Sequence, residues 1–348
     1  MNHNRSTGRP TIVKIAAQLE VSPSTVSRAF TRPELLHPDT VAAVKALAEE
    51  VGYVPNQLAR GLVSGRANAI GIVLSDIANP FFPPLIRSIQ RTAQESGLSV
   101  FIADSDGDAD QERQLIDNLG PQVHGIVNIS SRMPSRDLQK LAESHNIVLI
   151  NRDVADMSRI LVDTAPAIAQ AVALLASLGH RHLAYVGGPQ ASWSNTSRRR
   201  AVADAGREHG VTIDTHDTVL GSYNEAWELT HTLIGSGVTA AIAFDDVMAH
   251  GLLNGFAARG VRTPEHVSIV GCDDTLATKT QPELTTIAAN LESTAREATQ
   301  ILLAHRGRSR VAPTRGIHTA QLLPGGSVGP VPPSAPAAAR IRPMGGPQ

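Results

Sequence analysis

The sequence is poor in cysteine and in aromatic residues, and both shortages exclude classes of protein. Its 348 residues include one cysteine, Cys272, so neither an intramolecular disulfide nor a cysteine-rich zinc site can form. Aromatic residues make up 3% of the chain and hydrophobic residues 42%, so the core must be built from aliphatic side chains. A chain of this length buries about three quarters of its unfolded surface and folds without a covalent staple. The composition predicts a globular protein of about two or three domains.

The sequence also lacks any long apolar run. No stretch approaches the roughly 18 consecutive apolar residues that a membrane helix needs. The N-terminus does not read as a secretory signal, because Lys14, Gln18 and Glu20 interrupt its apolar residues. We therefore expect a cytoplasmic protein that makes no contact with membranes.

The chain has almost no net charge, but its charged residues are unevenly distributed. The whole chain carries −1 at pH 7. Residues 1–66 contain eight basic and five acidic residues and so carry +3, whereas the remainder carries −4. A basic N-terminal segment on an acidic body indicates a polyanionic partner such as nucleic acid, although the contrast is modest.

Short helices with defined starts are predicted near the N-terminus. Thr11 is a suitable N-cap for a helix over residues 12–19, whose apolar positions follow the helical period. Ser22 followed by Pro23 marks a second helix, because Ser is a favoured N-cap and Pro a favoured first helical residue. A third helix begins near residues 37–39 and ends at a glycine.

The first two helices are separated by a few residues, which is the spacing of a helix-turn-helix that reads the DNA major groove. Ser24 and Arg28 share one face of the second helix, while Val26 and Phe30 face inward. Arg28 can form bidentate bonds to a guanine edge, worth about 1–3 kcal/mol of discrimination. The alternative is a helical hairpin with no DNA function. Further groups that can contact phosphate or bases belong to Ser22, Pro23, Thr25 and Ser27.

From residue 69 onward, short apolar runs alternate with amphipathic stretches. The expected strands are residues 70–74, 100–103, 125–129, 147–150, 183–186, 240–244 and 267–271. The expected helices between them include residues 85–96, 168–178, 225–234 and 247–259. Such alternation predicts parallel sheets with helices on both faces, and about ten strands suit two sheets better than one. Ligands of such sheets bind beyond the carboxyl ends of the strands.

Catalytic and metal-binding motifs are lacking. The sequence contains no G-x-S-x-G, no Walker loop and no G-x-G-x-x-G after a strand. Cys272 lies beside Asp273, and a neighbouring carboxylate makes a thiol less acidic and so a poor nucleophile. Residues 104–110 carry alternate aspartates, but Ala109 stands where a calcium loop needs glycine. We predict no enzyme activity, no cofactor and no metal site.

Six motifs occur in order along residues 10–323. They are TIVKIAAQLEVSPSTVSR at residues 11–28, EVGYVPN at 50–56, ARGL at 59–62, SDIANPFF at 75–82, LGHR at 178–181 and GCDD at 271–274. Together they resemble the lactose-repressor/galactose-repressor (LacI-type) family of transcription regulators. The resemblance implies an α-helical helix-turn-helix head and an α/β core of two doubly wound lobes, like a periplasmic binding protein.

The resemblance also implies the domain boundaries. The DNA-binding domain would cover residues 1–62 and end in a hinge helix over residues 57–62. The two-lobed effector-binding and dimerisation core would cover residues 66–323. Residues 324–348 contain seven Pro and five Gly, which predicts a disordered tail.

The hinge helix is expected to order on operator DNA. Leu62 would wedge into a central step of the minor groove, where an apolar side chain unstacks bases and kinks the duplex. Ala59 would lie against the same groove. The alternative is a simple linker, with Leu62 packed on the core. The complete set of expected DNA contacts is Thr11, Ser22, Pro23, Ser24, Thr25, Ser27, Arg28, Asn56, Ala59 and Leu62.

The family binds its effector in the cleft between the lobes. Arg198 matches an arginine that contacts the ligand, and Asp273 matches an acid that accepts hydrogen bonds from it. Without the resemblance, Arg198 would be read as part of a solvated basic face. An aromatic wall with carboxylates and a guanidinium suits a polyhydroxylated ligand, a sugar or sugar derivative. The expected effector contacts are Phe81, Phe82, Arg198, Tyr223, Asp245 and Asp273.

The chain departs from the family pattern at three positions. Glu20 stands in the turn where family members usually have glycine, so we expect a strained residue with positive φ. His37 replaces a common serine cap. Asp245 replaces the usual asparagine, which changes the chemistry offered to the effector.

These observations favour a sequence-specific DNA-binding transcription regulator, a repressor, controlled by a small molecule. One head reads half a site, so we expect a homodimer on a near-palindromic operator, with a tetramer left open. The alternative is a cytoplasmic or transport-associated sugar receptor whose N-terminal helices do not bind DNA. An enzyme is a third reading, which no residue set supports. DNA binding that weakens steeply as salt rises would separate the first two.

Overall fold

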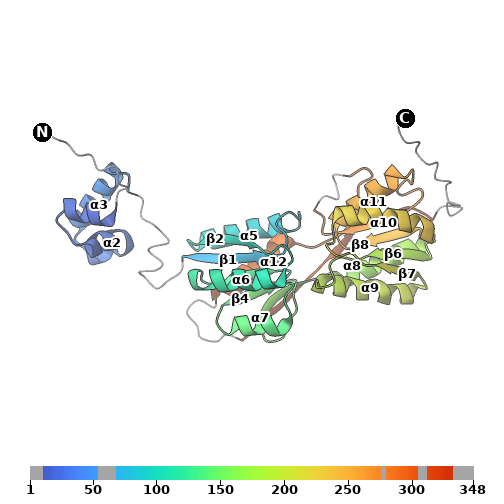
Figure 1. Ribbon diagram of the computed structural model, residues 1–348, viewed down its shortest axis with the longest axis horizontal. Coiled ribbons are helices and arrows are strands. Elements are labelled where there is room, and N and C mark those ends of the chain that lie inside the picture. The colour runs from blue at the N-terminus through green and yellow to red at the C-terminus, as the bar shows by residue number, and fades with distance from the viewer. Residues whose placement is uncertain (1–10, 54–67, 276–279, 305–311, 332–348) are drawn as a thin grey trace. The chain divides into compact units, whose positions relative to one another are not determined.

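The computed structural model describes residues 11–53, 68–275, 280–304 and 312–331. The chain forms two compact units, Met1–Asn68 and Ala69–Gln348 (Figure 1). The predicted hinge helix at residues 57–62 lies outside the described residues, and so do Asn56, Ala59 and Leu62. No helix of the described residues is long and apolar enough to span a membrane.

The first unit is a cluster of short helices whose starts are set by local capping. Its elements are α1 (Ile12–Gln18), α2 (Pro23–Thr31), the 3-10 turn η1 (Pro33–Leu35) and α3 (Pro38–Glu50). The Thr11 side chain accepts a hydrogen bond from the Lys14 backbone N–H, and Ser22 accepts one from Thr25. These side chains satisfy N–H groups that the helix leaves free at its start, so both predicted caps are confirmed.

The core of this unit is aliphatic and small. Its fully buried members are Ile15, Ala16, Val26, Ala29, Val44 and Ala48. Phe30 and Tyr53 close its edge with ring centroids 6.0 Å apart. Glu20 has φ of 54°, which confirms the expected left-handed residue in the turn between α1 and α2. Burial of Val26 and Ala29 leaves the opposite face of α2 exposed to solvent.

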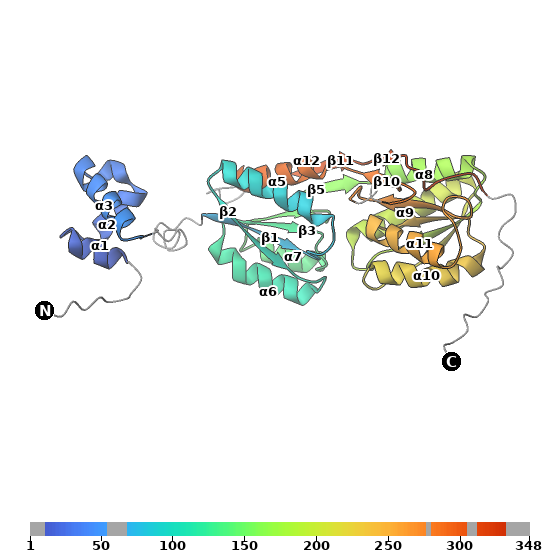
Figure 2. The same cartoon turned by 90° about the horizontal axis from the view of Figure 1, so that it is seen from above.

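The second unit consists of two α/β lobes, each built on a six-stranded sheet (Figure 2). The first lobe contains β1 (Ala69–Leu74), α5 (Phe82–Glu95), β2 (Ser99–Asp104), α6 (Ala109–Leu119), η2 (Gly120–Gln122), β3 (Ile126–Ile129), α7 (Ser135–Ala142), β4 (Ile147–Ile150), β5 (Ser158–Asp163), α12 (Leu291–Ala304) and β11 (Arg315–Thr319). Its strand order is β11-β5-β4-β3-β1-β2, with every neighbouring pair parallel. Helices α5 and α12 cover one face, and α6 and α7 the other.

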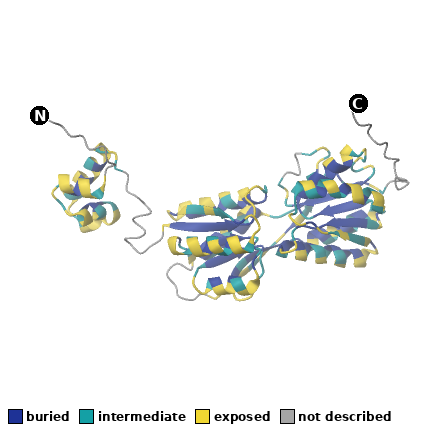
Figure 3. Ribbon diagram, viewed as in Figure 1, coloured by how far each residue is buried: buried dark blue, intermediate teal, exposed yellow. Residues whose placement is uncertain are grey.

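The second lobe repeats this plan. It contains α8 (Ala165–Ser177), β6 (His182–Val186), α9 (Trp193–His209), β7 (Thr212–His216), α10 (Tyr223–Ser236), β8 (Ala240–Ala243), α11 (Asp246–Ala258), β9 (Ser268–Cys272), β10 (Thr285–Ala288) and β12 (Gln321–Leu323). Its strand order is β12-β10-β9-β8-β6-β7, and only the β10–β12 pair is antiparallel. The central strands are buried on both faces, as parallel strands between helix layers must be (Figure 3).

The chain passes between the lobes at three places: after β5, after β10 and between β11 and β12. Each lobe is therefore completed by a late segment of the chain, α12 and β11 in the first lobe and β12 in the second. Three adjacent connections allow the lobes to rotate about them, which is the arrangement of a hinged, ligand-closing core.

The predicted fold class is confirmed, and every expected strand is present with its ends shifted by one residue at most. Strands β5, β7, β10, β11 and β12 were not anticipated. Strands β7 and β11 are edge strands with sequences TIDTH and RGIHT, whose polar residues hide the strand pattern.

The predicted disordered tail begins too early. Residues 324–331 pack along the second sheet instead: the Ser327 hydroxyl donates to the Ile269 carbonyl at 2.6 Å and accepts from the Thr285 N–H at 2.8 Å. Farther along, His180 contacts the Gly329 carbonyl at 3.0 Å. The Gly and Pro content predicts disorder because ordering such a segment costs backbone entropy. These hydrogen bonds offset that cost. Residues 332–348 lie outside the described residues.

Candidate functional site

A cavity of about 880 Å³ lies between the two lobes of the second unit. The first lobe lines it with the segments that follow β1, β2, β3 and β4, and the second lobe with those that follow β6, β7, β8 and β9. All these segments lie at the carboxyl ends of parallel strands, where α/β sheets bind ligands.

Arg198 reaches the cavity from α9, whose position is fixed by polar contacts at its start. Asn195 receives hydrogen bonds from the Tyr185 hydroxyl and the Gly188 N–H, both at 3.0 Å, and so ties α9 to the turn after β6. One turn later, the Arg198 guanidinium enters the cavity wall with 5% of the residue exposed. Arg198 is therefore not part of a solvated basic face, which was the alternative interpretation of its sequence neighbours.

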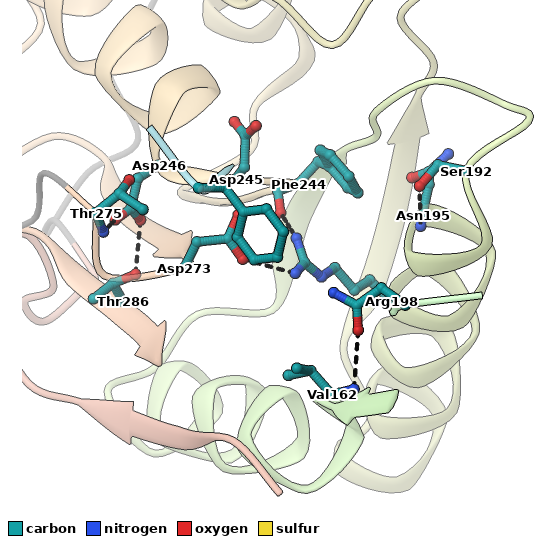
Figure 4. Close-up of polar contacts among 12 residues, drawn as sticks. Val162, Ser192, Asn195, Arg198, Phe244, Asp245, Asp246, Asp273, Thr275 and Thr286 are labelled. Carbon is teal, nitrogen blue, oxygen red and sulfur yellow. Dashed lines mark hydrogen bonds and ion pairs between the residues drawn. The ribbon is translucent and has the colours of Figure 1, made fainter. Parts of the chain in front are cut away.

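The Arg198 guanidinium makes three contacts in the second lobe. Its Nη2 donates to Asp273 Oδ1 at 2.8 Å, its Nη1 donates to the Phe244 carbonyl, and it lies 4.8 Å from the centre of the Phe244 ring (Figure 4). Its Nε has no hydrogen-bond partner among the described residues. The arginine is thus held by one carboxylate and one carbonyl, and its buried Nε–H is left unpaired.

Asp245 is the N-cap of α11 and is 2% exposed. Its Oδ1 accepts from the Met248 N–H at 2.8 Å, and its Oδ2 accepts from Asn79 Nδ2 at 3.0 Å. Burial raises the pKa of Asp245 to about 7, with a further increase from Asp273, while the hydrogen bonds from Met248 and Asn79 oppose the rise. Since Asn79 follows β1, this hydrogen bond joins the two lobes across the cavity.

Asp246, the next residue, holds a neighbouring segment of the cavity wall in place through hydrogen bonds. It is fully buried, and its carboxylate accepts from the Thr286 hydroxyl at 2.7 Å and from the Thr275 N–H at 2.9 Å (Figure 4). Burial also raises the pKa of Asp246 to about 7. The side chain holds the segment that follows β9, which carries Asp273.

Aromatic side chains form walls on both sides of the cavity. Phe81 and Phe82 precede and begin α5, and their rings meet edge to face with centroids 5.3 Å apart. Tyr223 begins α10, whose start is fixed by a capping box between Ser222 and Glu225. All six side chains expected from the sequence to contact an effector line this one cavity: Phe81, Phe82, Arg198, Tyr223, Asp245 and Asp273. Their role in ligand binding stays a prediction.

Several cavity residues were not anticipated. Three of them, Asp106, Ser130 and Asn151, share a positive φ with the predicted Asp273. Such backbone conformations cost about 1–3 kcal/mol each and gather at functional sites. Ser130 and Asn151 directly follow predicted strands, so the rule on strand ends could have found them. Asn79 lies within the SDIANPFF motif, but its partner Asp245 is too distant in the chain for the motif to reveal the contact.

Cys272 is not part of the lined surface. It is 2% exposed within the core of the second lobe, and burial is the chief cause that raises the pKa of its thiol. This environment agrees with the prediction of a packing residue.

In the first unit, the start of α2 presents polar groups to solvent. Ser24, Arg28 and Pro23 are exposed there, and Thr11 is exposed at the start of α1. Ser22 is occupied as the N-cap, and its hydroxyl lies 2.7 Å from that of Ser24 and 2.8 Å from that of Thr25. Ser27 is half-buried. The face expected to read DNA is therefore accessible, and Arg28 is its cation.

Comparison with known proteins gives matches for both units. The model of the bacterial regulatory proteins of the lacI family matches residues 11–56, and that of a periplasmic binding protein-like domain matches residues 172–328. The transcriptional regulator GalS of Salmonella typhimurium is 30% identical over 312 residues, covering 84% of this chain and 89% of that protein. Catabolite control protein A of Streptococcus mutans is 31% identical over 286 residues, covering 80% and 86%.

Solved structures share the same architecture. The lac repressor dimer bound to operator and the anti-inducer ONPF superposes with a TM-score of 0.81 at 21% identity, covering 92% of this chain and 99% of that one. A complex of the transcriptional regulator CelR with cellobiose gives a TM-score of 0.68 at 25% identity, covering 92% and 100%.

Proposed function

Since the chain belongs to the lacI family of bacterial regulatory proteins, it is a DNA-binding transcription regulator, and we propose that it is a repressor controlled by a small molecule bound between its lobes. The observation that carries the proposal is the cavity built around the buried Arg198–Asp273 pair, in a chain whose other unit exposes a helix-turn-helix. The relatives named above are transcription regulators, which agrees with the prediction of a non-enzyme. A protein that binds operator DNA in a bacterium would be located in the cytoplasm.

The DNA-reading surface is the exposed face of α2. Arg28 supplies the guanidinium for a base edge, and Ser24 lies one turn earlier on the same face. Because one such helix covers only half a site, the active species would be a homodimer on a near-palindromic operator. The lac repressor structure, a dimer on operator, supports this arrangement.

The effector is proposed to be a carbohydrate or a derivative of one. Asp245 and Asp273 accept hydrogen bonds, Arg198 donates them, and Phe81, Phe82 and Tyr223 provide apolar faces. Sugar rings need both kinds of contact. The CelR complex with cellobiose and a related regulator bound to D-xylulofuranose support this class.

Control of DNA binding would come from movement of the lobes about their three connections. The Asn79–Asp245 hydrogen bond spans the cavity, so a ligand that inserts between these groups changes how the lobes sit. Coupling of about 1–3 kcal/mol between the two sites is sufficient for regulation.

The test is selection of bound sequences from a random duplex pool, followed by gel shifts at increasing salt. The proposal expects a palindromic consensus, an affinity that falls steeply with salt, and loss of sequence preference in Arg28→Ala. The matched control is Lys140→Ala, which removes one exposed cation from the second unit. A sugar receptor without DNA function would enrich no sequence, and Arg28→Ala would then behave like the control.

A further inference from the structure

The first-lobe wall of the cavity contains an arginine to which the proposed function assigns no role. Arg132 follows β3 and lines the cavity. Its backbone N–H donates to Glu112 Oε2 at 2.9 Å. Among the described residues, however, its guanidinium has no hydrogen-bond acceptor and no carboxylate within ion-pairing distance. A guanidinium placed in a cavity wall in this way favours a ligand that supplies the missing acceptor.

Two half-buried arginines lie near one buried carboxylate in this wall. Glu112 is 1% exposed, and its carboxylate already accepts from Asn128 Nδ2 at 2.8 Å, from the Ser131 hydroxyl and from the Arg132 N–H. A second arginine, Arg152, lies close by and donates to the Met133 carbonyl at 2.6 Å. Two guanidinium groups thus share one buried carboxylate. Burial is the main cause that lowers the pKa of both arginines, and Glu112 counteracts it in each.

Nearby acids do not remove this excess. Asp76 is close enough to influence Arg132 electrostatically, but it is exposed and its carboxylate accepts from the Ala78 N–H at 2.8 Å. Asp106 also lines the cavity and is exposed. Solvent screens the charges of these exposed carboxylates more strongly than those of the half-buried arginines and the buried Glu112.

A second unsatisfied polar group lies at the end of the neighbouring strand. Ser75 lines the cavity and is 4% exposed, and its buried hydroxyl has no hydrogen-bond partner among the described residues. The register of β1 against β3 pairs Leu74 with Ile129, so Ser75 and Ser130 follow side by side. Arg132 comes two residues later. A free hydroxyl and a free guanidinium therefore occur on adjacent segments of one wall.

The opposite wall differs in charge. There Arg198 is paired with Asp273, and Asp245 offers carboxylate oxygen. One wall thus presents an unpaired guanidinium with two exposed carboxylates, Asp76 and Asp106, and the other presents a neutral pair and an acceptor. A neutral sugar would satisfy the second wall but leave the first wall without its acceptor.

We propose that the effector is an acidic sugar derivative, whose carboxylate or phosphate binds Arg132 and Ser75 while its hydroxyl groups face Arg198, Asp245 and Asp273. The proposal rests on the proposed function, because it takes this cavity as the effector site. Anionic oxygens are the acceptors that a guanidinium binds most strongly, in a bidentate manner.

The experiment measures ligand binding to the full chain by calorimetry and thermal unfolding. The probes are glucose and galactose, their uronates, their 6-phosphates and inorganic phosphate. Uronates and 6-phosphates differ from the parent sugars in one anionic group, and comparison of the two sets distinguishes carboxylate from phosphate. We expect an acidic probe to bind more tightly than its parent, and inorganic phosphate to protect the wild type at millimolar concentration.

Substitutions assign the binding to the proposed residues. Arg132→Gln should weaken the acidic probes about tenfold to a hundredfold, which is the range of a charge-assisted hydrogen bond. Arg132→Lys should restore part of the affinity, and Ser75→Ala should weaken it less. The control is Arg136→Gln, which removes an arginine of the same lobe whose side chain is 91% exposed.

Two results would overturn the proposal: neutral sugars that bind as tightly as their acids, or acids and phosphate that bind Arg132→Gln as they bind the wild type. Failure of every probe to bind the wild type counts against it as well. Operator binding by the ligand-free variants is measured in parallel. If the wild type binds no operator, the proposed function fails, and the comparison of acids with parent sugars still decides the anion site.

Discussion

Asp245 provides a sharp test of the electrostatics of the cavity. It is 2% exposed, and burial raises its pKa to about 7. In the unfolded chain the carboxyl has an ordinary pKa of about 4, so the folded state binds a proton more tightly than the unfolded state. Stability from this group is therefore greatest below the unfolded pKa and is lost as pH rises through the folded pKa. A difference of about three pKa units corresponds to about 4 kcal/mol at pH 8.

Asp245→Asn removes this titration and keeps the N-cap contact to Met248, but its single side-chain oxygen cannot also accept from Asn79. The asparagine oxygen can still accept at the start of α11, where asparagine is as good an N-cap as aspartate. We expect the variant to match the wild type below about pH 4, to be about 1 kcal/mol more stable at pH 5 and to gain further stability up to pH 8. The gain in the free energy of unfolding at pH 8 should be about 2–4 kcal/mol. The range extends down to about 2 kcal/mol because Asp246, whose pKa is also about 7, titrates together with Asp245.

The assay is urea unfolding of both proteins between pH 5 and pH 8. Asp110→Asn, an exposed acid in the first turn of α6, is the control and should show a difference that does not change with pH. The reasoning fails if Asp245→Asn is no more stable than the wild type at pH 8, or if its gain is the same at both ends of the range.

Three further predictions concern other parts of the chain. Arg198→Met leaves Asp273 buried without its cation and should lower the stability of the second unit by about 3–5 kcal/mol in urea unfolding; a loss equal to that of the exposed Arg200→Met would contradict this. Glu20→Gly should stabilise the first unit by about 1 kcal/mol, since glycine adopts φ of 54° without strain, and calorimetry would refute it by showing destabilisation. Removal of residues 324–348 should lower the melting temperature by several degrees, whereas removal of residues 332–348 alone should leave the Ser327 and Gly329 contacts intact; equal effects would contradict the correction to the tail.

The sequence predicted those features that depend on neighbours in the chain. The caps at Thr11 and Ser22 form within three residues, and the left-handed Glu20 follows from its place in a tight turn. The cavity could also be anticipated, because parallel strands bring their carboxyl ends together whatever their order. The resemblance selected Arg198 from a run of three arginines, which periodicity alone could not do.

Features that depend on distant pairing escaped the sequence. The register of β1 against β3 brings Ser75 beside the segment that carries Arg132, and the hydrogen bond from Asn79 to Asp245 joins residues of different lobes. Residues 324–331 are held by backbone groups at the starts of β9 and β10, which composition does not reveal. The polar edge strands β7 and β11 were missed for the same reason.

The most direct test of the account is reciprocity between the two sites. The affinity of the protein for its effector is measured by calorimetry with and without a saturating amount of the selected operator duplex, and operator affinity is measured with and without effector. If the cavity controls the DNA-binding unit, the two ratios must agree, at about 5- to 150-fold. An effector affinity that operator leaves unchanged would contradict the account.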